Sequence, residues 1–116
     1  MTILLSSTQR AALVFLAERQ ADEPLRRQIA GLDAVGGTAT MATLRLCDGS
    51  PRSSIPDGPA PVIIPVIDDS GDVAGELILW VLDGFADLVE QTWYGDEPPT
   101  RLPDRDQVRT YAESEL

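Results

Sequence analysis

The stretch that decides the fold class is residues 73–94, VAGELILWVLDGFADLVEQTWY. Apolar residues dominate both halves of it, and the dipeptide Asp83-Gly84 separates them. An Asp-Gly pair between two apolar runs favours a two-residue β-hairpin, because both residues tolerate the positive φ angles of a type I′ turn. The chain has no asparagine, so Asp-Gly is the dipeptide left for such a turn. We therefore expect antiparallel strands over residues 73–82 and 85–94.

Two further strands are expected before this hairpin. Residues 38–47 alternate in the manner of a half-buried strand, with one face formed by Ala42, Leu44 and Leu46. Residues 62–67 are a second apolar run, in which Pro65 favours an edge position or a bulge. Between them, residues 48–61 are rich in Pro, Gly and Ser and predict a loop.

The N-terminal part of the chain predicts two helices, over about residues 7–31. Ser6 and Gln9 have the spacing of a capping box before a helical apolar period. A second helix start follows at Pro24, where the missing N–H costs nothing, and Gly31 ends it. Residues 95–116 form an acidic, Pro-rich tail, with a short helix expected near its end.

Together these elements predict a single α+β domain over residues 1–116. Its architecture is two N-terminal helices packed on one face of a four-stranded, mainly antiparallel sheet, which spans about residues 38–94. If Leu82 pairs with Phe85, the helices should cover the face formed by Leu77, Leu79, Val81, Ala86 and Leu88.

The opposite face of this sheet is expected to be an interface. It is too apolar to face water comfortably and yet holds charged residues, and Tyr94 follows at the exit of the last strand. The register that places the helices gives this face Glu76, Ile78, Trp80, Asp87, Val89, Gln91 and Trp93, and if Ile67 pairs with Val73 the face also gains Val62, Ile64 and Val66. The predicted partner-binding residues are Val62, Ile64, Ile78, Trp80, Asp87, Val89, Trp93 and Tyr94. The cover could be a second copy of the chain, a foreign protein, or the C-terminal tail folded back by Pro98 and Pro99.

The charge of the chain is placed unevenly. Of the 116 residues, positions 1–50 carry five arginines and five acidic residues, whereas positions 51–116 carry the whole net charge of −10. Such a surface repels nucleic acid and anionic membranes and attracts basic proteins, although acidic surfaces also serve solubility alone. No apolar run is long enough to cross a bilayer, and no signal peptide is evident. The single cysteine, Cys47, agrees with a reducing compartment, so we expect a cytoplasmic protein.

Several residue types that catalysis commonly uses are missing. The chain has neither histidine nor lysine, which excludes Ser-His and Cys-His relays, imidazole metal ligands and lysine Schiff bases. The alternation of Asp68, Ser70 and Asp72 begins like a calcium loop, but the twelfth position is Leu79 instead of glutamate. Neighbouring carboxylates arise by chance in so acidic a chain. We therefore expect no metal, no cofactor and no enzymatic activity.

One resemblance bears on residues 32–103. The stretch from Gly75 to Gly84, continued by an aromatic pair and the acidic sequence Gly95-Asp96-Glu97-Pro98-Pro99, resembles a group of small uncharacterised bacterial proteins that are common in actinobacteria. Some members carry a cysteine cluster where this chain has residues 37–42, GTATMA. The resemblance implies the strand hairpin and its tail, and it implies no function.

Two functional hypotheses remain. The first is a non-enzymatic module that binds a protein through an apolar and aromatic sheet face with an acidic rim. Its partner would be a copy of itself or a basic target, and toxin neutralisation is one setting for the latter. The alternative is a small enzyme or ligand-binding protein that uses Asp and Glu residues in a pocket between sheet and helices.

Overall fold

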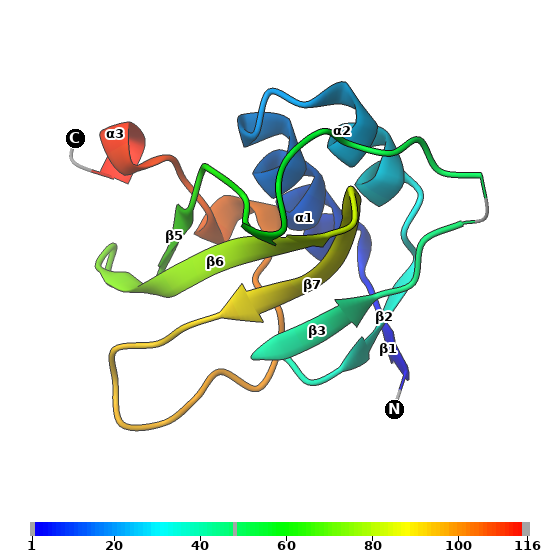
Figure 1. Cartoon of the computed structure of the whole chain (residues 1–116). Coiled ribbons are helices and arrows are strands. Elements are labelled where there is room, and N and C mark those ends of the chain that lie inside the picture. The colour runs from blue at the N-terminus through cyan, green and yellow to red at the C-terminus, as the bar shows by residue number, and fades with distance from the viewer. Residues whose placement is uncertain (1, 48, 115–116) are drawn as a thin grey trace.

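The computed structural model describes residues 2–47 and 49–114. It is an α+β fold in which two helices pack on one face of an antiparallel sheet (Figure 1). The elements are β1 (Thr2–Leu4), α1 (Ser7–Arg19), α2 (Glu23–Ala30), β2 (Ala34–Gly37), β3 (Met41–Leu44), β4 (Gly58–Pro59), β5 (Ile64–Ile67), β6 (Val73–Leu82), β7 (Phe85–Gln91), the 3₁₀ helix η1 (Arg105–Gln107) and α3 (Tyr111–Ser114).

The sheet has seven strands within the described residues, so the prediction of four strands is wrong. Its order is β1-β2-β3-β7-β6-β4, and β5 also pairs with β6. The long strand β6 is therefore flanked by β7 on one side and by β5 and β4 on the other. Three strands went unrecognised because β1 has three residues, β4 has two, and β2 ends in Gly36-Gly37, so none shows a periodic apolar pattern.

The β6–β7 hairpin turns at Asp83-Gly84, as the sequence predicts. Asp83 has φ 52° and Gly84 has φ 81°, the two positive values that a type I′ turn requires. A side chain at Gly84 would also collide with the backbone, because a Cβ there would lie 2.6 Å from the carbonyl oxygen of Ser53. Glycine is thus needed at this position both for the turn and for the close approach of the neighbouring loop.

A β-bulge at Asp87 changes which side chains of β7 face the helices. Val81 pairs with Ala86 but Trp80 pairs with Leu88, so Asp87 is an extra residue on β7. Beyond the bulge, each side chain of β7 points to the face opposite to the one that the predicted register gives it. Val89 lies fully buried beneath the helices, and Leu88 moves to the opposite face. The predicted placement of these two side chains is therefore wrong.

A second correction concerns β5. Ile67 does pair with Val73, the condition for placing Ile64 and Val66 on the opposite face, but the register shifts between Val66 and Ile67. Ile64 consequently pairs with Leu77 and is buried in the core beside it. The expectation that Ile64 and Val66 belong to the opposite face is wrong for the same physical reason, since one irregular residue reverses the alternation of a strand.

The core lies between the helices and the sheet. Ser6 caps α1 through the expected capping box with Gln9, and Asp22 accepts a hydrogen bond from the backbone of Leu25 at the start of α2. The largest fully buried side chains are Leu13, Leu16, Leu25, Ile29, Val35, Ile64, Leu77, Leu79, Val89, Leu102 and Val108. Leu102 and Val108 come from the tail, which therefore completes the core.

The tail passes behind the sheet, on the side of the helices (Figure 1). It leads into η1, which packs against α1, and Val108 then forms a bridge with Val66 at the edge of β5. The predicted helix at about 106–115 is replaced, within the described residues, by η1 and α3. The tail consequently leaves the opposite face of the sheet open over β3 and β7 and most of β6, whereas the C-terminal segment contacts β5, where Pro65 is buried, and Tyr111 contacts Glu76.

Candidate functional site

The face of the sheet that points away from α1 and α2 is called the open face below. Two rows of side chains cross it, because register places Met41, Glu90 and Ile78 side by side, and Thr43, Leu88 and Trp80 in the next row. The open face is defined as Leu4, Met41, Thr43, Arg45, Pro59, Glu76, Ile78, Trp80, Leu82, Leu88 and Glu90.

Several apolar side chains of the open face are exposed to solvent. Leu4 is 78% exposed, Leu82 is 55% exposed and Met41 is 47% exposed. Ile78 and Trp80, on the same strand as Leu82, are half-buried. They share the neighbouring strands β3, β7 and β6 with Met41 and Leu88, whereas Leu4 lies apart on the edge strand β1. Scattered apolar residues are normal on a protein surface, whereas a group of them on neighbouring strands is typical of a contact surface.

Trp80 is held in a fixed orientation on this face. Its indole Nε1 donates a hydrogen bond to Oε1 of Glu90 at 3.0 Å, across from β6 to β7. The two residues are diagonal neighbours, since Glu90 pairs with Ile78 and Trp80 pairs with Leu88. A large aromatic side chain whose rotamer is already fixed loses little entropy on binding, which is why tryptophan anchors many interfaces.

Carboxylates surround these apolar side chains. Glu76 and Glu90 lie on the face itself, while Asp83 lies at the hairpin end and Asp72 at the turn that begins β6. The carboxylate of Glu76 accepts a hydrogen bond from the hydroxyl of Tyr111. Burial raises the pKa of Tyr111 well above its ordinary value, and Glu76 raises it further, so the phenol keeps its proton to a higher pH than an ordinary tyrosine does.

The structure places two of the eight predicted partner-binding residues on the open face and the other six elsewhere. Ile78 and Trp80 lie on the open face, and the exposed side chains of Asp87 and Tyr94 lie at the bulge and just beyond β7. Val62 is half-buried against the core, and the side chain of Gln20 bonds to its N–H at 2.9 Å and to its carbonyl at 2.8 Å. The remaining three do not reach the open face: Ile64 and Val89 are in the core, and Trp93 lines a cavity on the helix side.

Sequence reasoning missed several residues of the open face. Leu88 was assigned to the helix side, and Leu4 belongs to a strand that was not predicted. Met41 was the one that a pattern could have found, because it alternates with the buried Ala42 in a predicted strand. The local sequence of β7 gives no sign of its bulge, so the position of Leu88 required the pairing itself.

A second candidate is a cavity of about 360 Å³ where the tail passes the ends of β6 and β7. Trp93 borders it, 43% exposed. Its other lining residues include Val66, Ile67, Asp68, Gln91, Glu97, Thr100, Arg101, Leu102 and Gln107. The cavity is therefore mixed in character, with apolar walls and several polar groups.

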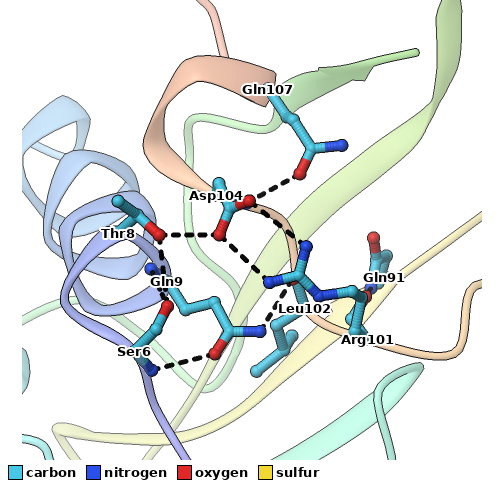
Figure 2. Close-up of polar contacts among 8 residues, drawn as sticks. All are labelled: Ser6, Thr8, Gln9, Gln91, Arg101, Leu102, Asp104 and Gln107. Atoms are coloured by element: carbon cyan, nitrogen blue, oxygen red, sulfur yellow. Dashed lines mark hydrogen bonds and ion pairs between the residues drawn. The ribbon is translucent and has the colours of Figure 1, made fainter. Parts of the chain in front are cut away.

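The polar groups around this cavity mostly hold the tail in place (Figure 2). Buried Gln9 donates from Nε2 to the carbonyl of Leu102 at 3.1 Å, and buried Gln91 donates to the carbonyl of Arg101 at 3.1 Å. The guanidinium of Arg101 in turn donates to both oxygens of Asp104, each at 3.2 Å. These side chains are thus already used structurally.

Asp104 joins the tail to the first turn of α1. The hydroxyl of Thr8 donates to its Oδ1 at 2.7 Å. That hydrogen bond and those from Arg101 hold the pKa of Asp104 below its ordinary value, so the carboxylate stays ionised to a lower pH than an ordinary aspartate does. Asp104 thus links the tail to the first turn of α1.

Comparisons with known proteins assign no relative. No family model matches the sequence, and neither the curated proteins nor the solved structures include a match. Within residues 2–47 and 49–114, no group of three or more Asp, Glu or Cys side chains is placed to hold a metal ion. In the same part of the chain, no helix has both the length and the apolar character needed to cross a membrane.

Proposed function

We propose that this chain is a non-catalytic protein-binding domain that docks a partner on the open face of its sheet. The observation that carries the proposal is a pre-oriented Trp80 among exposed apolar side chains on a sheet whose other face is already covered. A sheet buries its apolar faces against other layers, and here one layer is missing. The tail is a poor candidate for that layer, because Leu102 and Val108 anchor it on the helix side.

Photo-crosslinking in cells that produce the chain tests this proposal. A photoreactive amino acid at Leu82 or Met41 should give a discrete crosslinked product that contains a second protein, whose peptides mass spectrometry then identifies. The matched control is Ala30, an exposed position on α2. Equal crosslinking yields from Ala30 and from the open face would refute docking at this surface, as would the absence of any product from Leu82 and Met41.

The compartment we propose is the cytoplasm. Cys47 is a free, exposed thiol. A free thiol of this kind persists in a reducing compartment and tends to oxidise or pair in an oxidising one. Localisation of a tagged chain by fractionation tests this assignment.

The cavity beneath the tail supports a second candidate function, which is binding of a small ligand. Its volume of about 360 Å³ lies within the range of roughly 300 to 1,000 Å³ that is usual for ligand sites. Binding there should quench or shift the fluorescence of Trp93 and leave the open face free. We rank it second because the polar groups of Gln9, Gln91 and Arg101 already form hydrogen bonds that hold the tail.

A further inference from the structure

We infer that the partner of the open face is a basic protein surface, and that a second copy of this chain is not its occupant. The inference rests on the proposed function and adds the chemistry of the partner. It follows from where the charges lie on the fold, together with the apolar side chains between them.

The net charge is distributed unevenly along the chain, and therefore also among the parts of the structure. Residues 1–50, which supply α1, α2 and the strands β1 to β3, have no net charge, whereas residues 51–116 carry −10. Within them, residues 51–94 supply β4 to β7, the half of the sheet that carries Trp80, and hold eight acidic residues and one arginine, while the rest of the negative charge lies in the tail. A potential of this sign and size raises the rate of encounter with basic proteins and slows encounter with acidic ones.

The open face itself repeats this asymmetry. Glu76 precedes Ile78 by two residues on β6, and Glu90 pairs with Ile78 from β7. The turns at the two ends of β6 add Asp72 and Asp83, and the carboxylate of Asp83 lies 3.5 Å from the guanidinium of Arg52. On the β3 side the charged group is a cation, Arg45, whose guanidinium lies next to Gly36. The half of the open face on β6 and β7 is thus negative, with Glu90 among its apolar side chains and the other carboxylates along β6 and at its ends.

Self-association through this face is electrostatically unfavourable. In a two-fold contact the same patch meets itself, so a face that holds the carboxylates of Glu76 and Glu90 but only the guanidinium of Arg45 cannot pair all of its charges. Both chains would also bring a net charge of −10 to a separation comparable with the screening length, which is about 8 Å at physiological salt. A partner that offers apolar side chains flanked by Arg or Lys avoids both unfavourable effects, because its cations pair with the carboxylates of the open face.

The test uses two synthetic helical peptides of about 18 residues, because a helix is the element that most often covers a sheet face. Both carry the same leucine stripe, and their polar positions are arginine in one and glutamate in the other. Titration calorimetry with the full chain should give at least tenfold tighter binding of the arginine peptide. Its Kd should also rise about tenfold between 50 and 300 mM NaCl, because salt screens charge pairs on the open face.

Matched variants separate the open face from general attraction to an acidic protein. Leu82→Ser should weaken the arginine peptide about tenfold, because an exposed anchor is lost. Glu76→Gln should weaken it about threefold, whereas Glu97→Gln, which removes the same charge beside the helix-side cavity, should leave Kd unchanged. Equal losses from Glu76→Gln and Glu97→Gln would overturn the inference.

Three other outcomes also overturn it, and they differ in what they imply for the proposed function. Equal affinity for both peptides would leave docking on the open face intact and refute the basic partner. A chain that is dimeric by light scattering, and that becomes monomeric on Leu82→Ser, would make a second copy the occupant. A monomeric chain that binds neither peptide, and gives no crosslink from Leu82, would refute both proposals.

Discussion

Replacement of Val89 by alanine should destabilise the fold by about 2 to 3 kcal/mol, whereas the same change at Leu88 should cost less than about 1 kcal/mol. Val89 is 0% exposed. Its truncation removes two buried methyl groups, at about 0.8 kcal/mol each, and adds the cost of the cavity left behind. Leu88 is the larger side chain, but it is half-buried on the open face, where its loss encloses no cavity.

Urea unfolding followed by far-ultraviolet circular dichroism measures both free energies. The slope of the unfolding free energy against urea concentration should be the same for the two variants, so that the midpoints of unfolding report stability alone. The pair is diagnostic because the bulge at Asp87 decides which of the two side chains faces the helices. A larger loss for Leu88→Ala than for Val89→Ala would mean that β7 runs without this bulge, and the open face would then have a different composition.

Three further predictions concern the parts that support this face. Gln28→Met should cost about 2 to 4 kcal/mol in the same assay, because the buried N–H of Ala86, now 2.7 Å from the Gln28 amide oxygen, loses its acceptor; a loss below 1 kcal/mol would refute it. Gly75→Ala should lower stability by about 1 to 3 kcal/mol, because a Cβ there would lie 1.9 Å from the carbonyl oxygen of Thr92; a neutral result would argue against this contact. The raised pKa of Tyr111 means that its contribution to stability is full below the pKa of an unfolded tyrosine and is lost as the pH rises beyond it. In a Tyr94→Phe chain the 295 nm phenolate absorbance should therefore stay absent at pH 10.5, and half-ionisation there would contradict the assignment.

Some elements of the fold could be predicted from short stretches of sequence alone. The turn at Asp83-Gly84 was predictable because its chemistry depends on two adjacent residues and their φ angles. The start of α1 was predictable for a similar reason, since Ser6 and Gln9 satisfy each other within one turn. Placement of both helices on one face followed from the order of elements along the chain.

The face assignments needed information that the sequence does not carry. Leu88 and Val89 are both apolar and adjacent, so the pattern of β7 is compatible with either register. Only pairing with Trp80 and Val81 places the extra residue at Asp87. In β5, the shift after Val66 has the same effect, and alternation cannot indicate it because every residue of 62–67 is apolar or proline.

The tail was also beyond local reasoning. Its prolines and charges are typical of a loosely attached segment, yet Leu102 is 1% exposed. The partners of this segment are Gln9 and Gln91, and the former lies 93 residues away in the sequence. Contacts of such long range depend on the completed fold, and no short pattern announces them.

The position of the tail has a consequence for synthesis on the ribosome. Phe15 of α1 packs beneath the guanidinium groups of Arg19 and Arg105, at 4.4 Å and 3.9 Å from its ring centre. Arg105 is translated 90 residues after Phe15, which corresponds to several seconds at the usual rate of about 5 to 20 residues per second. Throughout that interval Arg105 is not yet present to cover the ring of Phe15. The growing chain therefore offers an apolar surface that a chaperone would recognise until the last part of the core emerges.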